Sequence, residues 1–504
     1  MSLAILHSRA SAGIHAPLVT IETQVSRGIP RFNIVGLPET IIKESKDRVR
    51  CAIINSQFEF PAKRITVNLA PADLPKEGSR FDLAIALSIL FATKQVPYHE
   101  TEAYEFAGEL ALSGELRPIS GILPFVLSTK AANRKLIFPY ANLEQASLVT
   151  NTTLCPTNHL LEVCNHFMGG QSLEIITQHQ TRDTLKWPID LNEIVGQSHA
   201  KRALEIAAAG NHSILFYGPP GTGKSMLAQR LPTILPPLTE EESIEVAAIQ
   251  SISHHSINPK NWGLRPFRAP HHTASTAALV GGGSTPKPGE ISLAHLGILF
   301  LDELPEFDRR VLEALREPLE TANITISRAS QNVEFPANFQ LVAAMNPCPC
   351  GYLGDQTHVC RCTEEQIRRY RQKLSGPFLD RIDLKVEVSR IHHDLLIQSN
   401  ENNAEKSETI RTRIIHAREI QKARGQTFNA QLKGLQFNKH CNLKSPSRMF
   451  LKNATERLGL SARAIHKIIR IARTIADLEN HDMIAMEDIA EALSYRDVKS
   501  YNKN

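Results

Sequence analysis

The sequence predicts a multidomain α/β protein, and three observations lead to this fold class. The chain has 504 residues, too many for one hydrophobic core, so about two to four domains are expected. A glycine-rich loop, 218–225, stands between a short apolar run and a helical pattern. A second apolar run, 297–301, ends in two carboxylates. Apolar strands that alternate with helices and deliver polar groups at their ends are typical of a parallel sheet covered by helices.

Composition sets the broad class. Apolar residues make up 42% and charged residues 22% of the chain, which are ordinary values for a soluble globular protein. No apolar run reaches the ~18 residues of a membrane span, and the first residues lack the pattern of a signal peptide. We therefore expect a cytoplasmic protein without a membrane span, whose eight cysteines are thiols or metal ligands rather than disulfides.

The basic charge is concentrated at the end of the chain. Residues 405–504 carry 19 basic and 11 acidic residues, whereas the whole chain has a net charge of +5. This excess is compatible with a polyanionic partner and equally with a solvated basic face.

Residues 1–170 predict an α+β domain. Ile65–Leu69, Gly108–Leu112 and Leu116–Ile119 have the length and composition of strands, and Phe81–Leu90 that of a buried helix. A polar linker, 171–188, follows. Composition alone assigns this region no function.

The glycine-rich loop predicts a phosphate site. An apolar strand, 213–217, leads into it, and a helix beginning at Met226 should end at Pro232. Backbone N–H groups and the helix N-terminus would then converge on a phosphate. The loop matches G-x-x-x-x-G-K-[ST]. The expected nucleotide-binding residues are Gly218, Pro219, Pro220, Gly221, Thr222, Gly223, Lys224 and Ser225.

The second apolar run predicts the rest of the hydrolytic site. Its strand would deliver Asp302 to hold Mg²⁺ with Ser225, and Glu303 to polarise the attacking water. A later buried strand, 339–345, ends in Asn346, whose amide can orient water against the γ-phosphate. The two adjoining histidines His271 and His272 lack carboxylates at metal-ligand spacing, so a role in the loop is favoured.

Two further arginines complete this set, one in the segment 376–383 and one opening a late helix: Arg381 and Arg463. Together these parts resemble an AAA+ ATPase with Walker A and B motifs, a sensor-1 asparagine, an arginine finger and a sensor-2 arginine. The resemblance implies ATP and Mg²⁺ as cofactors. Arg381 would complete a neighbouring subunit's site. Lys467 and Arg470 follow Arg463 at helical spacing and could face nucleotide, DNA or solvent; solvent is expected for these two.

Three segments make the resemblance more specific: Arg31–Glu39, Phe267–Ser275 and Pro288–His295. They resemble the ComM/YifB family of magnesium-chelatase-like AAA+ ATPases. This implies an AAA+ core at 189–397, a linker at 398–408 and a helical lid at 409–504. It also implies an N-terminal domain similar to the Lon protease domain (ribosomal S5 domain 2-like). Arg80 stands where Lon-type proteases have their serine, and Leu123 near their lysine, so this domain is expected to be non-proteolytic.

The resemblance implies a homohexameric ATP-dependent helicase that drives branch migration while DNA is integrated in natural transformation. Two other interpretations stay open: a chelatase-type ATPase that remodels a protein partner, and a scaffold whose ATPase only gates assembly. DNA-stimulated hydrolysis would separate the first from both.

A predicted hairpin supplies the expected DNA contact. Its strands, 324–328 and 332–335, carry Arg328 near the tip, where it could meet phosphates without reading sequence. The alternative for Arg328 is an exposed arginine at a subunit interface. If Arg328 is not the contact, Arg268 is the next candidate.

Four cysteines predict a metal site. Cys348, Cys350, Cys360 and Cys362 have C-x-C-x₉-C-x-C spacing, and four clustered thiolates suit tetrahedral Zn²⁺. Four reduced structural thiols are the alternative.

Overall fold

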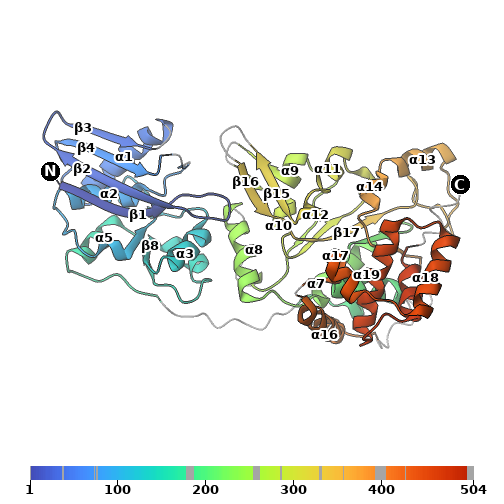
Figure 1. The fold of residues 1–504 in the computed structure, drawn as a ribbon. Helices are drawn as coiled ribbons and strands as arrows, with labels where there is room; N and C mark the ends of the chain where they lie inside the picture. The colour runs from blue at the N-terminus through green and yellow to red at the C-terminus, as the bar shows by residue number, and fades with distance from the viewer. Residues whose placement is uncertain are drawn as a thin grey trace. The chain divides into compact units, whose positions relative to one another are not determined.

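The computed structural model divides the chain into two compact units, shown in Figure 1. Unit 1 comprises Met1–Thr184 and Glu240–Trp262, and unit 2 comprises Leu185–Thr239 and Gly263–Asn504. The structure describes residues 2–36, 39–72, 74, 76, 78–176, 187–253, 261–283, 286–327, 332–355, 357–391, 404–425 and 427–496. Each unit has its own hydrophobic core, so each is described by itself.

Unit 1 begins with a four-stranded sheet in the order β1-β2-β4-β3, in which only the β3–β4 pair is parallel. Its strands are β1 (Ser2–Arg9), β2 (Leu18–Ser26), β3 (Arg31–Val35) and β4 (Arg64–Ala70). Two helices, α1 (Glu39–Asn55) and α2 (Asp82–Ala92), accompany this sheet. Every residue of α2 is buried, which confirms the buried helix predicted at 81–90.

The second half of unit 1 is a three-stranded parallel sheet in the order β5-β8-β9 and a short antiparallel pair, β6–β7. The strands are β5 (Tyr104–Phe106), β6 (Glu109–Leu110), β7 (Leu116–Arg117), β8 (Lys135–Pro139) and β9 (Leu154–Thr157). The helices are α3 (Ile122–Ala131), α4 (Leu143–Ala146) and α5 (Leu160–Phe167), with the short 3-10 helices η1 (Thr101–Ala103) and η2 (Tyr140–Asn142).

One helix of unit 1 comes from the middle of the chain. Helix α8 (Glu240–Ile252) follows the phosphate-loop helix in sequence but contacts α3 (Figure 1). Ala247 joins the same hydrophobic cluster as residues of α3, and Trp262 packs against that cluster. The predicted core at 189–397 includes 240–262, which the structure assigns to unit 1. Burial against a segment distant in sequence leaves no local signal that could have shown this.

Unit 2 is built on a five-stranded parallel sheet in the order β11-β14-β17-β10-β18. The strands are β10 (Ile214–Tyr217), β11 (Phe267–Arg268), β14 (Ile298–Leu301), β17 (Gln340–Met345) and β18 (Leu384–Glu387). Three of them were predicted, at 213–217, 297–301 and 339–345. In β10, β14 and β17 every residue is buried, as expected for strands covered on both faces.

Helices surround this sheet, and the C-terminal region is helical (Figure 1, red). The longer helices are α6 (Ser198–Gly210), α7 (Lys224–Ile234), α13 (Glu364–Gln372), α16 (Ser407–Gly425), α17 (Gly434–His440), α18 (Ser445–Leu458), α19 (Ala462–Leu478) and α20 (Met486–Ser494). Ile214 of the sheet, Ile414 of α16 and Ile471 of α19 belong to one hydrophobic cluster. Sheet and C-terminal helices therefore share one core.

Shorter elements connect the strands of unit 2. They are η3 (Leu191–Glu193), α9 (Thr276–Val280), β12 (Gly281–Gly282), β13 (Lys287–Pro288), α10 (Glu290–Leu293), η5 (Leu304–Glu306), α11 (Arg309–Ala314), α12 (Pro318–Thr321), β15 (Asn323–Ser327), β16 (Asn332–Pro336), α14 (Gly376–Leu379) and η6 (Asn429–Gln431). The predicted hairpin is confirmed as the antiparallel pair β15–β16.

One predicted helix end is wrong. Helix α7 continues through Pro232 to Ile234. Proline removes only its own N–H bond and clashes with the carbonyl four residues earlier. Because Pro232 lies in the last turn, little of the helix remains to be disrupted.

Candidate functional site

The phosphate loop lies at the carboxyl end of the central strands. Strand β10 is hydrogen-bonded to both β17 and β18 and ends at Tyr217. A Cβ atom at Gly218 would lie 2.2 Å from the carbonyl oxygen of Val388, so only glycine fits there. Gly223 caps α7 with φ +90°, a conformation that favours glycine. The loop can therefore bend and bring backbone N–H groups to an anion.

Lys224, the first residue of α7, is buried and surrounded by oxygen atoms. Its Nζ donates to the carbonyl oxygens of Gly218 and Pro219, both at 2.8 Å, and to Oδ1 of Asn346 at 3.1 Å. Burial lowers the pKa of Lys224 to about 8. The lysine thus touches the predicted sensor-1 amide directly, and a phosphate would be a better partner than the neutral oxygens.

Helix α7 and strand β14 bring the Ser225 hydroxyl and the Asp302 carboxylate together. Ser225 Oγ donates to Oδ2 of Asp302 at 2.6 Å. Asp302 follows β14, which pairs with β17 so that Leu301 lies opposite Ala343. Oxygen ligands from Ser225 and Asp302 fit the preference of Mg²⁺, so these two side chains could hold that ion.

Glu303 follows Asp302 in sequence, and its carboxylate contacts His272, which was not predicted to belong to the site. Its Oε2 lies 3.2 Å from Nδ1 of His272, and its side chain is 54% exposed. The His272 ring contacts that of His271 with centroids 4.1 Å apart. No motif spacing links His272 to Glu303, because the contact depends on how the loop after β11 folds back to β14.

The two predicted arginines occupy different surroundings. Arg381 donates from Nη2 to Oε1 of Glu320 at 2.5 Å and from Nη1 to the carbonyl oxygen of Pro377 at 2.7 Å. Arg463 is exposed near the start of α19, and Ser461 caps that helix. Among the described residues, neither arginine contacts the phosphate loop by a hydrogen bond or ion pair.

One expectation about α19 is wrong. Lys467 does not face solvent: its Nζ lies 2.7 Å from Oδ1 of Asp383, and the lysine side chain is 11% exposed. His212 Nδ1 lies 3.2 Å from Oδ2 of the same carboxylate. The two partners keep the pKa of Asp383 below its usual range despite its burial. Lys467 therefore joins α19 to the sheet.

The two candidate DNA contacts are Arg328 and Arg268. Arg328 lies outside the described residues, beyond the end of β15. Arg268 at the end of β11 forms a bidentate pair with Glu290, with both N–O distances 2.6 Å. A phosphate would have to displace that carboxylate.

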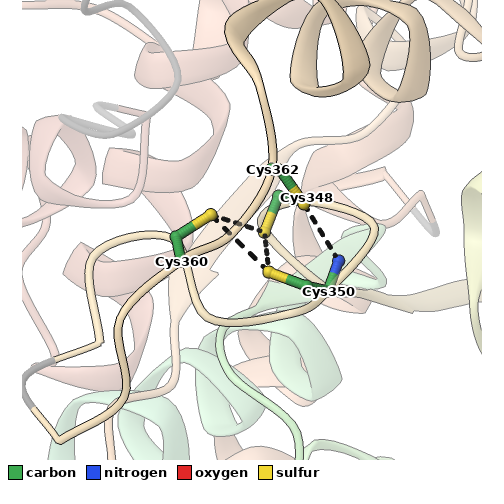
Figure 2. A group of neighbouring side chains, drawn as sticks. All are labelled: Cys348, Cys350, Cys360 and Cys362. Atoms are coloured by element: carbon green, nitrogen blue, oxygen red, sulfur yellow. Dashed lines mark hydrogen bonds between the residues drawn. The ribbon is translucent and has the colours of Figure 1, made fainter.

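The four cysteines lie together after β17, as Figure 2 shows. Their sulfur atoms all lie within 4.8 Å of one another. The Sγ atoms of Cys348, Cys350 and Cys360 are separated by 3.4–3.7 Å, and Cys362 Sγ accepts from the backbone N–H of Cys350. The pKa of Cys350 is lowered to about 6, first because the backbone N–H of Tyr352 donates to it, whereas burial raises the pKa of Cys348 and of Cys362. A thiolate is the form that binds zinc.

Comparison with known proteins decides the family. The family described as "Magnesium chelatase, subunit ChlI" matches residues 190–396, "Subunit ChlI of Mg-chelatase" matches 21–142, and "Magnesium chelatase, subunit ChlI C-terminal" matches 404–496. Competence protein ComM of Haemophilus influenzae is 51% identical over 501 residues, which cover 98% of each chain. The chain belongs to the ComM/YifB family of magnesium-chelatase-like proteins.

Two other members of the ComM/YifB family match over the same length. YifB of Salmonella typhimurium is 49% identical and YifB of Escherichia coli 46% identical, each over 98% of this chain and 97% of its own. The magnesium-chelatase 38 kDa subunit of Cereibacter sphaeroides is 25% identical over 32% of this chain and 54% of that subunit. The family resemblance predicted from the sequence is confirmed.

The ComM/YifB assignment also places the chain in the AAA+ class, with mixed α/β architecture and a C-terminal helical region. Among the described residues, no helix combines the length and the apolar character that crossing a bilayer requires.

Proposed function

We propose that this protein is an ATP-driven DNA motor that works as a ring, expected to be a homohexamer, and promotes branch migration of DNA junctions in the cytoplasm during natural transformation. The observation that carries the ATPase part is the convergence of Lys224, Asn346, Ser225 and Asp302 at one edge of the parallel sheet. The DNA part is supported by full-length similarity to a competence protein.

Each residue of the site has a proposed role. Lys224 and the backbone of the loop would bind the phosphates, while Ser225 and Asp302 would hold Mg²⁺. Glu303 would polarise the attacking water once it leaves His272. Arg381 would reach a neighbouring subunit's γ-phosphate after separating from Glu320, and Arg463, which is exposed, is free to contact nucleotide.

The proposed DNA contact is Arg328 on the β15–β16 hairpin. This hairpin connects α12 to β17, which ends at Met345, directly before Asn346, so a change at the nucleotide could shift it. Arg268 is the weaker candidate because its guanidinium already binds Glu290.

Unit 1 is proposed to keep a Lon-like fold without proteolysis. Arg80 stands at the position of the serine nucleophile, and Leu123 near that of its base is fully buried. A buried aliphatic side chain cannot accept a proton from a nucleophile.

The test of the proposal is the ATP hydrolysis rate with no DNA, single-stranded DNA, duplex DNA and a branched junction. We expect stimulation that is largest with the junction and that falls steeply with salt, because phosphate contacts release counterions. An Arg328→Ala variant should keep the DNA-free rate but lose most of the stimulation, whereas Arg310→Ala, an exposed arginine on α11, should keep both. A rate that no DNA changes would contradict the DNA role.

The second candidate is a chelatase-type ATPase that remodels a protein partner, which the matches to magnesium-chelatase subunits favour. It predicts stimulation by a protein partner and indifference to DNA in the same assay.

We also propose that Cys348, Cys350, Cys360 and Cys362 hold one Zn²⁺. Four sulfur atoms within 4.8 Å match the tetrahedral four-thiolate site that zinc forms in structural positions. The site would fix the loop between Asn346 and α13.

A further inference from the structure

A cavity of about 450 Å³ in unit 1 contains a buried arginine, Arg80, that has no acidic partner among the described residues. Its polar lining includes Ser79, Arg80, Glu109, Ser120, Gln145 and Ser251. The volume lies within the range of small-molecule sites. All lining residues belong to unit 1, and Ser251 is contributed by helix α8.

Arg80 is 7% exposed, and its Nη2 donates to the carbonyl oxygen of Ser120 at 3.1 Å. Among the described residues, its guanidinium makes no other hydrogen bond and no ion pair. Burial lowers the pKa of Arg80 to about 10. An arginine guanidinium has five N–H donors in a planar fork. Since Arg80 uses one of them on a described residue, the others are available to a ligand in the cavity.

Two other arginines of the same unit, the buried Arg9 and the half-buried Arg48, are neutralised. Arg9 forms two hydrogen bonds with Glu105, at 2.6 and 2.7 Å, and Arg48 lies 2.7 Å from Asp82. Burying a charge without a partner costs several kcal/mol. Among the described residues, Arg9 and Arg48 therefore have carboxylate partners, whereas Arg80 has none and lines the cavity.

The structure around Arg80 is fixed before any ligand arrives. Asn142 donates to and accepts from the backbone of Ile119, both at 2.9 Å, and Gly121 N–H donates to the carbonyl oxygen of Ser251 at 3.2 Å. Gly121 also begins α3, which has no side-chain cap at its N-terminus. A helix N-terminus favours negative charge, and a Cβ atom at Gly121 would lie 3.9 Å from Nη2 of Arg80.

Glu109 limits the charge of an acceptable ligand. It lines the cavity and accepts a hydrogen bond from Ser79, but it forms no ion pair with Arg80. A dianion such as phosphate would meet repulsion from this carboxylate, whereas a singly charged carboxylate could bind the guanidinium fork and direct a hydroxyl toward Glu109.

We propose that this cavity binds a small singly charged carboxylate, held by a bidentate contact with Arg80, at the place where helix α8 contributes Ser251 to the lining. This site is independent of the proposed ATPase and DNA functions.

The test uses lactate as the probe and the full-length protein. Saturation-transfer NMR reports weak binding from the ligand's own signals, and sodium chloride keeps the ionic strength constant. We expect a saturable lactate signal with wild type that is lost in Arg80→Gln. It should persist in the control Arg31→Gln, which changes an exposed arginine at the start of β3. In competition, acetate should displace lactate more strongly than phosphate does. Equal signals in Arg80→Gln and wild type, no signal in wild type, or the opposite order of displacement would overturn the proposal.

Hydrogen exchange separates a binding role from a structural one. Lactate should slow amide exchange at 118–126 and at the end of α8 in wild type but not in Arg80→Gln. Without lactate, Arg80→Gln should be at least as protected as wild type, because it removes an uncompensated buried charge. Loss of protection in that variant without lactate would make Arg80 a structural residue and overturn the assignment.

Discussion

Lys224 in unit 2 and Arg80 in unit 1 are both buried cations that the described residues leave without an ion pair. Burial lowers the pKa of Lys224 to about 8 and that of Arg80 to about 10. They differ in their surroundings. Lys224 has three oxygen acceptors and lies beside Ser225, which binds Asp302, whereas Arg80 has one acceptor, a backbone carbonyl.

This difference separates a site for a reaction from a site for binding. The surroundings of Lys224 include a hydroxyl and carboxylates that could hold a metal and activate water. The lining of the cavity around Arg80 includes the guanidinium, which can bind an anion, and one carboxylate, Glu109. In both places an uncompensated charge lowers stability until an anion arrives, so both are expected to be stabilised by their ligands.

The largest expected effect belongs to Arg381. If it completes a neighbouring subunit's site, Arg381→Ala should lower turnover on the order of 10³-fold. The exposed Arg310→Ala is the matched control and should leave turnover unchanged. Mixing Arg381→Ala with Glu303→Gln protein should restore activity above the sum of the parts, measured as steady-state hydrolysis. No restoration at any ratio would argue against sites shared between subunits.

Lys224→Met tests whether the buried cation of unit 2 binds ATP. Loss of two charge-assisted hydrogen bonds to phosphate should weaken ATP binding by about 10²-fold, at ~1.5 kcal/mol each. The free energy of unfolding without nucleotide should not fall, because the variant removes a buried charge. Binding is measured by equilibrium titration and stability by denaturant unfolding, with Lys373→Met on the surface as the control. Unchanged ATP affinity would remove Lys224 from the site.

We expect zinc to bind to the four cysteines of unit 2 and not to unit 1. Purification without chelator should yield one zinc per chain, lost in Cys348→Ser or Cys360→Ser. Exchange protection should then fall at 345–363 but not in the β1–β4 sheet, because zinc binding is coupled to local folding. Cys51→Ser in unit 1 is the control. Metal analysis that finds no zinc in the wild type would refute the site.

The smallest expected effect is the uptake of a proton by Lys224 when ATP binds. Lys224 has a pKa of about 8 without nucleotide, and phosphates should raise it. ATP binding should therefore take up a proton at about pH 9, where the free lysine is largely neutral, and hardly any at about pH 7. Affinity should also decline as pH rises above 8. Calorimetry in two buffers of different ionisation enthalpy measures the uptake, and equal apparent enthalpies at the higher pH would contradict it.

Much of unit 2 was predictable because its signals are local. The loop, the run before Asp302 and the run before Asn346 each combine a buried strand with a polar end, and parallel strands bring such ends to one edge. The contact of Lys224 with Asn346 follows from the pairing of β10 with β17.

The remaining features depend on contacts between distant segments. His272 reaches Glu303, Lys467 reaches Asp383, and helix α8 joins unit 1. The isolation of Arg80 could not be predicted either, since it requires knowing that no carboxylate in the described part of the unit pairs with it. Local patterns report which residues are buried but not which residues meet.

The most direct measurement of the central claim is strand exchange on a synthetic four-way junction with homologous arms. Wild type with ATP and Mg²⁺ should convert the junction into two duplex products. Glu303→Gln should bind ATP and the junction but leave it unresolved, because its amide cannot polarise water. Conversion by Glu303→Gln at the wild-type rate, or no conversion by wild type that hydrolyses ATP, would contradict the account.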